Sequence, residues 1–339
     1  MPSKGKRHSL LKRIRYMDKK RPEEPSKKTK KSKYGRLVLL VVVALFLFTV
    51  IIMAVNSKKP GDLSLKDVDR KVKGAHFVRT NQALIIQMSE NWMPNDLFWP
   101  TVLLDNMPNF QIGELEVLRY NVRVLRDNLS RMRTTDKLDP FAEAAFTALS
   151  NDPNKWWFPS AESKWELCYN KLEAFYGNLL TGKANFYPRS DNLVSLLDQY
   201  VSLMGGANTR LINAPGDIKR TLSIEGQKED GSRNPVVVNI EIPWYQIDDN
   251  FYYAQGVAYA LYESFKAIRI DFQDVLVDKN SVKLMDKIVE VLGRCDFEPL
   301  IVFNGDPSSV FANHSLNLSG VFNDARQKIN SLIAALKQG

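Results

Sequence analysis

"GELEVLRYNVRVLRDNLSRM", residues 113–132, spaces its leucines and valines by three and four positions. The repeat consists of Leu115, Leu118, Val122, Leu125, Leu129 and Met132. Such spacing gathers apolar side chains on one face of an α-helix. Similar seams recur over residues 165–179, 193–204 and 321–336. Each is shorter than the three or four heptads that a free coiled coil needs, so the sequence predicts a bundle of helices that cross at shallow angles.

The second half of the chain contains a different pattern. "RTLSIEG" (220–226) and "NPVVVNIEI" (234–242) alternate apolar and polar residues on either side of a polar turn, which predicts a β-hairpin. "EPLIVFNGD" (298–306) is a candidate third strand, and "LMGGAN" (203–208) is interpreted as the end of a helix. The predicted fold class is therefore mainly α, a single transmembrane helix followed by an α-helical bundle ectodomain with a small β-hairpin or β-sheet element in its second half.

A long apolar run lies near the N-terminus. "LVLLVVVALFLFTVIIMAV", residues 37–55, has no charged residue and one polar residue, Thr49. A helix of this length rises about 28 Å, close to the thickness of the hydrocarbon core of a bilayer. The alternative, a cleavable signal peptide, has a short charged region, an apolar core of about 7–15 residues and small residues at the cleavage site. None of these features is present, so we interpret the run as an uncleaved membrane anchor.

The positive charge of the chain is confined to its first 36 residues. The 339 residues carry a net charge of +9, but residues 1–36 hold 15 Lys/Arg against three acidic residues, a net of +12, which leaves −3 for the rest. A segment so poor in apolar residues is expected to be disordered and to contact anionic lipid head groups through residues 4–36. Binding to nucleic acid is not expected, because no aromatic residues are interleaved with the basic run and no folded reader accompanies it.

Cations near the ends of the apolar run predict its orientation. Residues 17–36 hold nine Lys/Arg and residues 56–75 hold six. The side with more cations stays in the cytoplasm, so residues 56–339 are expected across the membrane, which in a bacterium places them in the periplasm and the helix in the inner membrane. The predicted organisation is a cytoplasmic tail (1–36), a transmembrane helix (37–55), a juxtamembrane stem (56–79), a helical region (80–215) and an α+β region with a C-terminal helix packed on it (216–339).

Two segments rich in proline and tryptophan precede predicted helices. In "NWMPNDLFWPTVLLDNMPNFQIGELE" (91–116) three prolines prevent a continuous helix. In "NDPNKWWFPSAESKWE" (151–166) Ser160 is expected to cap the helix that follows. We expect both to be packing corners, in which polar side chains close turns or cap helices and Trp92, Phe98 and Trp99 are largely buried. Exposed rings would instead indicate a binding surface. The candidate residues are Trp92, Asp96, Phe98, Trp99, Asp105, Asn106, Trp156 and Trp157.

Enzymatic alternatives have weaker support in the sequence. A glycosidase needs two carboxylates about 5–10 Å apart, and the candidate pairs are Asp96 with Asp105 or Glu162 with Glu166. Acidic residues that precede helices usually cap them, however, so we expect no catalysis. His76 and His314 lie outside any metal-binding motif, and no nucleotide fingerprint is present. The sequence therefore assigns no catalytic, cofactor-binding or metal-binding residue and predicts no cofactor.

The chain contains two cysteines, Cys168 and Cys295. Cys168 lies on the same apolar stripe as Trp165, Leu172 and Phe175, where a thiol behaves as a small hydrophobic group. We therefore predict a buried free thiol. A single disulfide is the alternative that an oxidising compartment would permit.

Four segments carry a resemblance to a known family: the stretch 91–116 quoted above, "LRDNLSR" (125–131), "WWFPSAES" (156–163) and "FYPRSDNL" (186–193). They resemble an uncharacterised bacterial family of single-pass inner-membrane proteins that is known only as a domain of unknown function. The resemblance implies a membrane anchor and an α-rich ectodomain, and it supplies no catalytic residues.

The expected function is that of a membrane-anchored periplasmic, non-enzymatic scaffold or assembly module, with the lipid bilayer and an unidentified envelope protein as partners. The alternative is a periplasmic protein that binds or cleaves cell-wall glycan, with peptidoglycan as its partner.

Overall fold

The computed structural model describes residues 28–65, 68–97, 99–133, 135–213, 221–227, 233–239, 246–299, 302 and 313–338. The chain divides into two compact units, Met1–Ile52 and Met53–Gly339. Residues 1–27 of the predicted basic tail lie outside the described residues. Residues 28–36 were also predicted to be disordered, but they are helical and belong to the first helix, α2 (Lys28–Asn56), so that prediction was wrong for them.

From residue 37 to residue 55, helix α2 is apolar around its whole circumference. Among the described residues, Tyr34–Asn56 is the one stretch long and apolar enough to cross a membrane. The large apolar side chains along this run are exposed, for example Leu40 at 65% and Phe46 at 65%. A helix with no polar face has no favourable position in water, whereas the hydrocarbon core of a bilayer would bury it.

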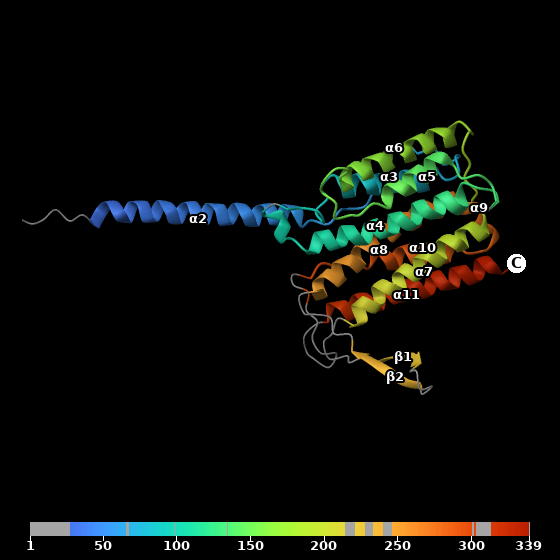
Figure 1. The fold of residues 1–339 in the computed structure, drawn as a ribbon. Coiled ribbons are helices and arrows are strands. Elements are labelled where there is room, and N and C mark those ends of the chain that lie inside the picture. The colour runs from blue at the N-terminus through green and yellow to red at the C-terminus, as the bar shows by residue number, and fades with distance from the viewer. Residues whose placement is uncertain are drawn as a thin grey trace, which may run out of the picture. The chain divides into compact units, whose positions relative to one another are not determined.

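The second unit is a bundle of helices that run side by side along much of their length (Figure 1). Helices α3, α5 and α6 form one side, α4 and α8 lie in the middle, and α7, α10 and α11 form the other side (Figure 1). This arrangement confirms the predicted mainly α class and the helical bundle. The helices are α3 (Ala75–Ser89), α4 (Asn106–Val124), α5 (Pro140–Leu149), α6 (Ala161–Leu180), α7 (Ser190–Asn213), α8 (Ile247–Asp271), α9 (Gln273–Asp278), α10 (Val282–Gly293) and α11 (His314–Lys337).

Helices α4 and α8 pack with their backbones in contact. Gly113 of α4 faces the carbonyl oxygen of Tyr253, and Gly256 of α8 faces that of Phe110. A Cβ atom at these positions would lie 2.2 Å and 1.9 Å from the two oxygens, far inside van der Waals contact. The two glycines therefore permit the closest approach in the centre of the bundle.

A buried polar network connects four helices in the core. Asn121 of α4 donates from Nδ2 to Asn81 Oδ1 on α3 (2.8 Å) and to Ser264 Oγ on α8 (2.9 Å). Its Oδ1 accepts a hydrogen bond of 2.5 Å from the Tyr200 hydroxyl on α7. Because each of these groups has a partner, the network does not carry the cost of unsatisfied buried polar atoms and fixes how the helices meet.

The predicted seams are buried, with two corrections. Leu115, Leu118, Val122, Leu125 and Leu129 are at most 1% exposed, but Met132 is 56% exposed. The prediction for Met132 was wrong because the helix ends in a single π-helical turn, η2 (Leu125–Leu129), after which the chain leaves the helical path. The interpretation of residues 203–208 as a helix end was also wrong. Helix α7 continues to Asn213, because Met204, Ala207 and Leu211 extend the buried stripe that faces α11.

Two strands follow α7 in the sequence. β1 (Thr221–Gln227) and β2 (Arg233–Asn239) pair in antiparallel fashion, with Thr221 opposite Asn239. The turn between them (228–232) and the connections to the helices (214–220 and 240–245) lie outside the described residues. The hairpin as a packed element of the second half therefore stays a prediction. So does the strand at 298–306, of which residues 298, 299 and 302 alone are described.

Both cysteines are free and buried, which confirms the predicted free thiol at Cys168 and excludes the bridge. Burial raises the pKa of Cys168, and burial together with the neighbouring Asp296 carboxylate raises the pKa of Cys295 to about 12. Both thiols therefore stay protonated and unreactive at neutral pH.

Candidate functional site

The C-terminal end of α2 is joined to the bundle through its last residue. Asn56 Oδ1 accepts a hydrogen bond of 2.8 Å from Asn91 Nδ2, and both residues belong to the second unit. Asn91 is the first residue of the proline-rich segment. This segment therefore begins where the apolar helix ends.

The chain after Asn56 then lies along α8 and the end of α10. Lys59 Nζ forms an ion pair of 2.7 Å with Asp296, and the Tyr259 hydroxyl donates to the Gly61 carbonyl at 2.9 Å. The backbone N–H of Leu63 donates to Glu263 Oε1 at 3.1 Å. The segment between α2 and α3 is thus fastened to the bundle at several points.

Two loops meet beside Asn91. They are residues 92–105, between α3 and α4, and residues 150–160, between α5 and α6, and we call them the aromatic loops. Trp92 Nε1 donates to the Pro153 carbonyl at 2.9 Å, and Asn95 Nδ2 donates to Glu162 Oε1 at 2.8 Å. The Trp92 ring meets the buried Trp165 ring edge to face, with 5.5 Å between the centroids. These contacts hold the two loops together as one corner.

The corner contains one buried ring of the predicted set. Trp92 is 5% exposed, which confirms its predicted burial, and Ser160 caps α6 by accepting a hydrogen bond from Ser163 N–H. The prediction for Trp99 was wrong, because its ring is 57% exposed. In that part of the loop Pro100 is buried instead, and the short 3-10 helix η1 (Thr101–Leu103) has no buried residue. Phe98 lies outside the described residues.

The second aromatic loop presents its rings to solvent. Trp156 is 52% exposed, Trp157 69% and Phe158 90%. The rings of Trp156 and Trp157 contact each other edge to face, with centroids 5.1 Å apart. Exposed rings are what the sequence analysis expected of a binding surface. The structure therefore divides the candidate rings into one that is buried, Trp92, and a group that forms an exposed apolar surface.

The acidic candidates are not gathered into a catalytic pair. Asp96 is half-buried, and Asp105 is exposed at the N-cap of α4 without a side-chain capping bond. Asn106 is half-buried, and its buried Oδ1 has no hydrogen-bond partner in the described part of the chain. Glu162, in the first turn of α6, accepts the hydrogen bond from Asn95 described above and so ties the first loop to the start of α6.

Asp105 lies near two aspartates of α8 that the sequence did not single out. Burial and the negative charges of Asp105 and Asp248 raise the pKa of Asp249 to about 6. Asn109 Nδ2 donates to Asp249 Oδ1 at 2.8 Å, so α4 and α8 contact each other at their N-terminal ends. Within the described ranges no group of three or more His, Cys, Asp or Glu could hold a metal ion.

A pocket of about 170 Å³ opens beside the end of α2, and one buried acid lines it. Glu114 of α4 is 1% exposed, its Oε1 has no hydrogen-bond partner among the described residues, and burial raises its pKa to about 8. Gln111 supports the wall of the pocket by donating to the Asn91 carbonyl at 2.6 Å. Sequence reasoning missed Glu114, because nothing in "GELE" separates a buried glutamate from an exposed one. Other lining residues include Asn56, Lys58, Met88, Met93, Met107 and Phe110.

Depressions on the outer face of α4 form a second candidate surface, which we call the α4 groove. Tyr120 lines two of them, one shared with Arg123 and Phe146 and the other with Arg210 and Tyr253. The Arg210 guanidinium lies over the Tyr253 ring at 4.6 Å. Arg123 is exposed, and the described part of the chain offers it no ion pair or hydrogen bond. One cation of the groove is therefore available to a ligand.

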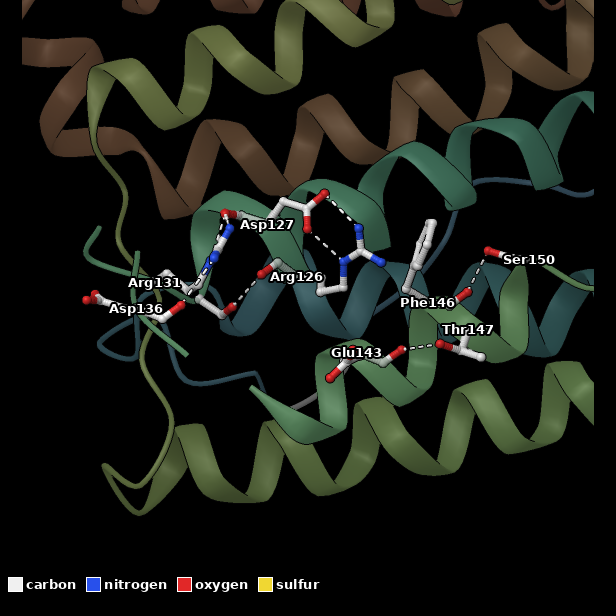
Figure 2. Close-up of polar contacts among 9 residues, drawn as sticks. Arg126, Asp127, Arg131, Asp136, Glu143, Phe146, Thr147 and Ser150 are labelled. Carbon is white, nitrogen blue, oxygen red and sulfur yellow. Dashed lines mark hydrogen bonds and ion pairs between the residues drawn. The ribbon is translucent and has the colours of Figure 1, made fainter. Parts of the chain in front are cut away.

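The π-helical turn at the end of α4 fixes the neighbouring arginines, as Figure 2 shows. Arg126 forms hydrogen bonds of 2.7 and 2.9 Å with Asp127 and lies 4.0 Å above the Phe146 ring. Arg131 turns back and donates to the backbone carbonyls of Asp127 and Asp136 (Figure 2). Both guanidinium groups already form hydrogen bonds within the chain, in contrast to that of Arg123.

Comparison with known proteins identifies the family. A family described as an uncharacterized protein conserved in bacteria, DUF2333, matches residues 28–339, which is all but the first 27 residues. The chain belongs to this family. The match confirms the resemblance found in the sequence. No curated protein and no solved structure matches the chain.

The DUF2333 match begins at Lys28, the first residue of α2, and so takes in the membrane-length helix together with the bundle. The family description states no reaction and no ligand. Function must therefore be inferred from the sites of this chain, which are the aromatic loops, the Glu114 pocket and the α4 groove.

Proposed function

We propose that this DUF2333 protein is a membrane-anchored, non-enzymatic scaffold or assembly module of the bacterial cell envelope, with residues 56–339 in the periplasm. The observation that supports this most is the join at Asn56. The membrane-length helix ends at a residue that is hydrogen-bonded to Asn91 of the bundle. A folded unit attached in this way stays beside the bilayer surface, where it can present its faces to other envelope proteins.

The orientation of the anchor gives the first expected result. Because the cations before the apolar run outnumber those after it, a reporter enzyme that is active only in the periplasm should be active when fused after Gly339. A reporter that is active only in the cytoplasm should be inactive at the same position. The opposite pair of activities would place the bundle in the cytoplasm and overturn the proposed compartment.

The partner is proposed to be an envelope protein that contacts the α4 groove through an acidic side chain. Arg123 supports this proposal, because it is an exposed cation without a partner of its own in the described structure, and the aromatic rings of Tyr120 and Phe146 lie beside it. An arginine of this kind can donate two parallel hydrogen bonds to one carboxylate, which gives a contact both direction and charge selectivity.

A photo-crosslinking residue at position 120, which lines the groove beside Arg123 and leaves that guanidinium in place, should therefore give a discrete protein adduct in living cells. The matched control is position 283 on α10, an exposed lysine that lines none of the depressions of the α4 groove. We expect an adduct from position 120 and none from position 283. Identical adducts from both positions, or adducts to peptidoglycan in place of protein, would contradict the proposed partner.

A further inference from the structure

We propose that the exposed side chains of the aromatic loops lie in the head-group region of the bilayer, so that the bundle contacts the membrane at a second place besides α2. This inference rests on the proposed function, because it requires α2 to cross that bilayer. It goes beyond the proposed function because it assigns the aromatic loops to the lipid–water interface, and a membrane anchor alone does not imply that contact.

The exposed apolar side chains of the bundle are concentrated on these loops. Beyond Asn56, twelve large apolar side chains are exposed among the described residues, and seven of them belong to the aromatic loops. Single exposed apolar residues are normal on a protein surface, whereas a contiguous group marks a contact with another phase or partner. The seven are Leu97, Trp99, Val102, Leu103, Trp156, Trp157 and Phe158.

The two loops present these side chains together. Besides the Trp92 and Asn95 contacts to Pro153 and Glu162, Asn95 Nδ2 also lies 3.4 Å from the Lys155 carbonyl, directly before Trp156. The buried Trp92 ring therefore fixes the base of both loops. Their exposed rings form one surface with a rigid support, which a stable contact requires.

The bilayer is the occupant that the attachment of the chain favours. Asn91 is hydrogen-bonded to Asn56, where the membrane-length helix ends, and Trp99 follows eight residues later. Eight residues span at most about 28 Å even when fully extended, so Trp99 lies within that distance of Asn91 and can reach the interface where α2 would leave the bilayer. The second loop is fastened to the first through Pro153.

The residue types also match a lipid–water interface. Tryptophan is enriched there, because its ring is apolar and its indole N–H can bond to head groups. Lys58 and Lys155 are exposed near the loops and have no ion pair within the described ranges, so they can contact anionic phosphates. A water-exposed position would leave the Phe158 ring 90% accessible with no compensating contact.

Fluorescence quenching in vesicles tests the proposal with the full chain. The protein is reconstituted in phosphatidylethanolamine–phosphatidylglycerol vesicles whose acyl chains carry bromine close to the head groups. We expect marked quenching of the wild-type emission, to which six tryptophans contribute. A variant with Trp99→Phe, Trp156→Phe and Trp157→Phe should lose at least half of the quenching. In the matched control, Trp165→Phe, removal of a buried emitter should leave the quenching in place.

A second variant changes the surface without touching the core. Trp157→Glu combined with Phe158→Glu replaces two largely exposed rings, so circular dichroism should show an unchanged fold while quenching of the remaining emission falls. Equal quenching in wild type and the triple phenylalanine variant would overturn the proposal. Flotation of the same vesicles distinguishes failure of the loop contact from failure of the membrane anchor. Protein that floats but is not quenched refutes the loop contact alone, whereas protein that fails to float refutes the anchor and the contact together.

Discussion

Replacing Trp92 with alanine is expected to lower the free energy of unfolding of the bundle by about 3–5 kcal/mol, the usual cost of truncating a large buried ring. Trp92 is 5% exposed, packs against Trp165 and donates to the Pro153 carbonyl across the corner. Its removal leaves a cavity and separates the two aromatic loops. Equilibrium unfolding in urea, followed by circular dichroism on the full chain in detergent, measures the change.

The control for this substitution is Trp99→Ala. The Trp99 ring is 57% exposed, so its loss should change the free energy of unfolding by less than about 1 kcal/mol. Both substitutions remove an indole ring from the same loop, and the two rings differ in how deeply they are buried. Equal destabilisation by both would show that the loop packs differently from the arrangement described above.

Glu114→Gln is expected to stabilise the protein in a pH-dependent manner. Burial raises the pKa of Glu114 from 4.5 to about 8. Between these values the folded chain keeps a proton that the unfolded chain has released, so the free energy of unfolding of the wild type falls as pH rises, by about 1.4 kcal/mol per unit. Glutamine keeps the shape and removes the ionisation. The variant should therefore be more stable by about 3 kcal/mol at pH 7.

Urea unfolding of wild type and Glu114→Gln at pH 4, 7 and 8.5 measures this difference. The two proteins should be nearly equally stable at pH 4, where the glutamate is protonated in both states. The gap should open through pH 7 and level off above pH 8. Parallel pH profiles would show that the carboxylate of Glu114 is solvated or paired, in contradiction to its buried, unpartnered position.

The helical bundle could be predicted because a helix that is buried on one face has apolar residues at regular intervals in its sequence. Leu115 to Leu129 and Cys168 follow that spacing and are buried in the structure. The prediction fails where the backbone leaves the regular helix, so the π-helical turn exposed Met132 against the pattern. It also fails where packing outweighs local propensity, as in α7, which continues through two consecutive glycines.

The candidate site was less accessible to sequence reasoning, because its geometry depends on residues far apart in the chain. Composition marked both aromatic loops but could not say which rings turn inward. Trp92 is buried because Pro153 and Trp165, more than sixty positions away, receive it, whereas Trp99 has no such partner and is exposed. The bond between Asn56 and Asn91 leaves no local signal either, although it places the loops beside the end of the apolar helix.

The membrane anchor is the central claim, and alkaline extraction tests it most directly. Membranes from cells that produce the full chain are washed with carbonate at high pH, which releases peripheral proteins and leaves spanning helices in the lipid. We predict that the wild-type chain stays in the membrane pellet, whereas a variant with Leu45→Lys and Phe48→Lys, which places two charges in the middle of α2, is released. Release of the wild-type chain into the supernatant would contradict the account.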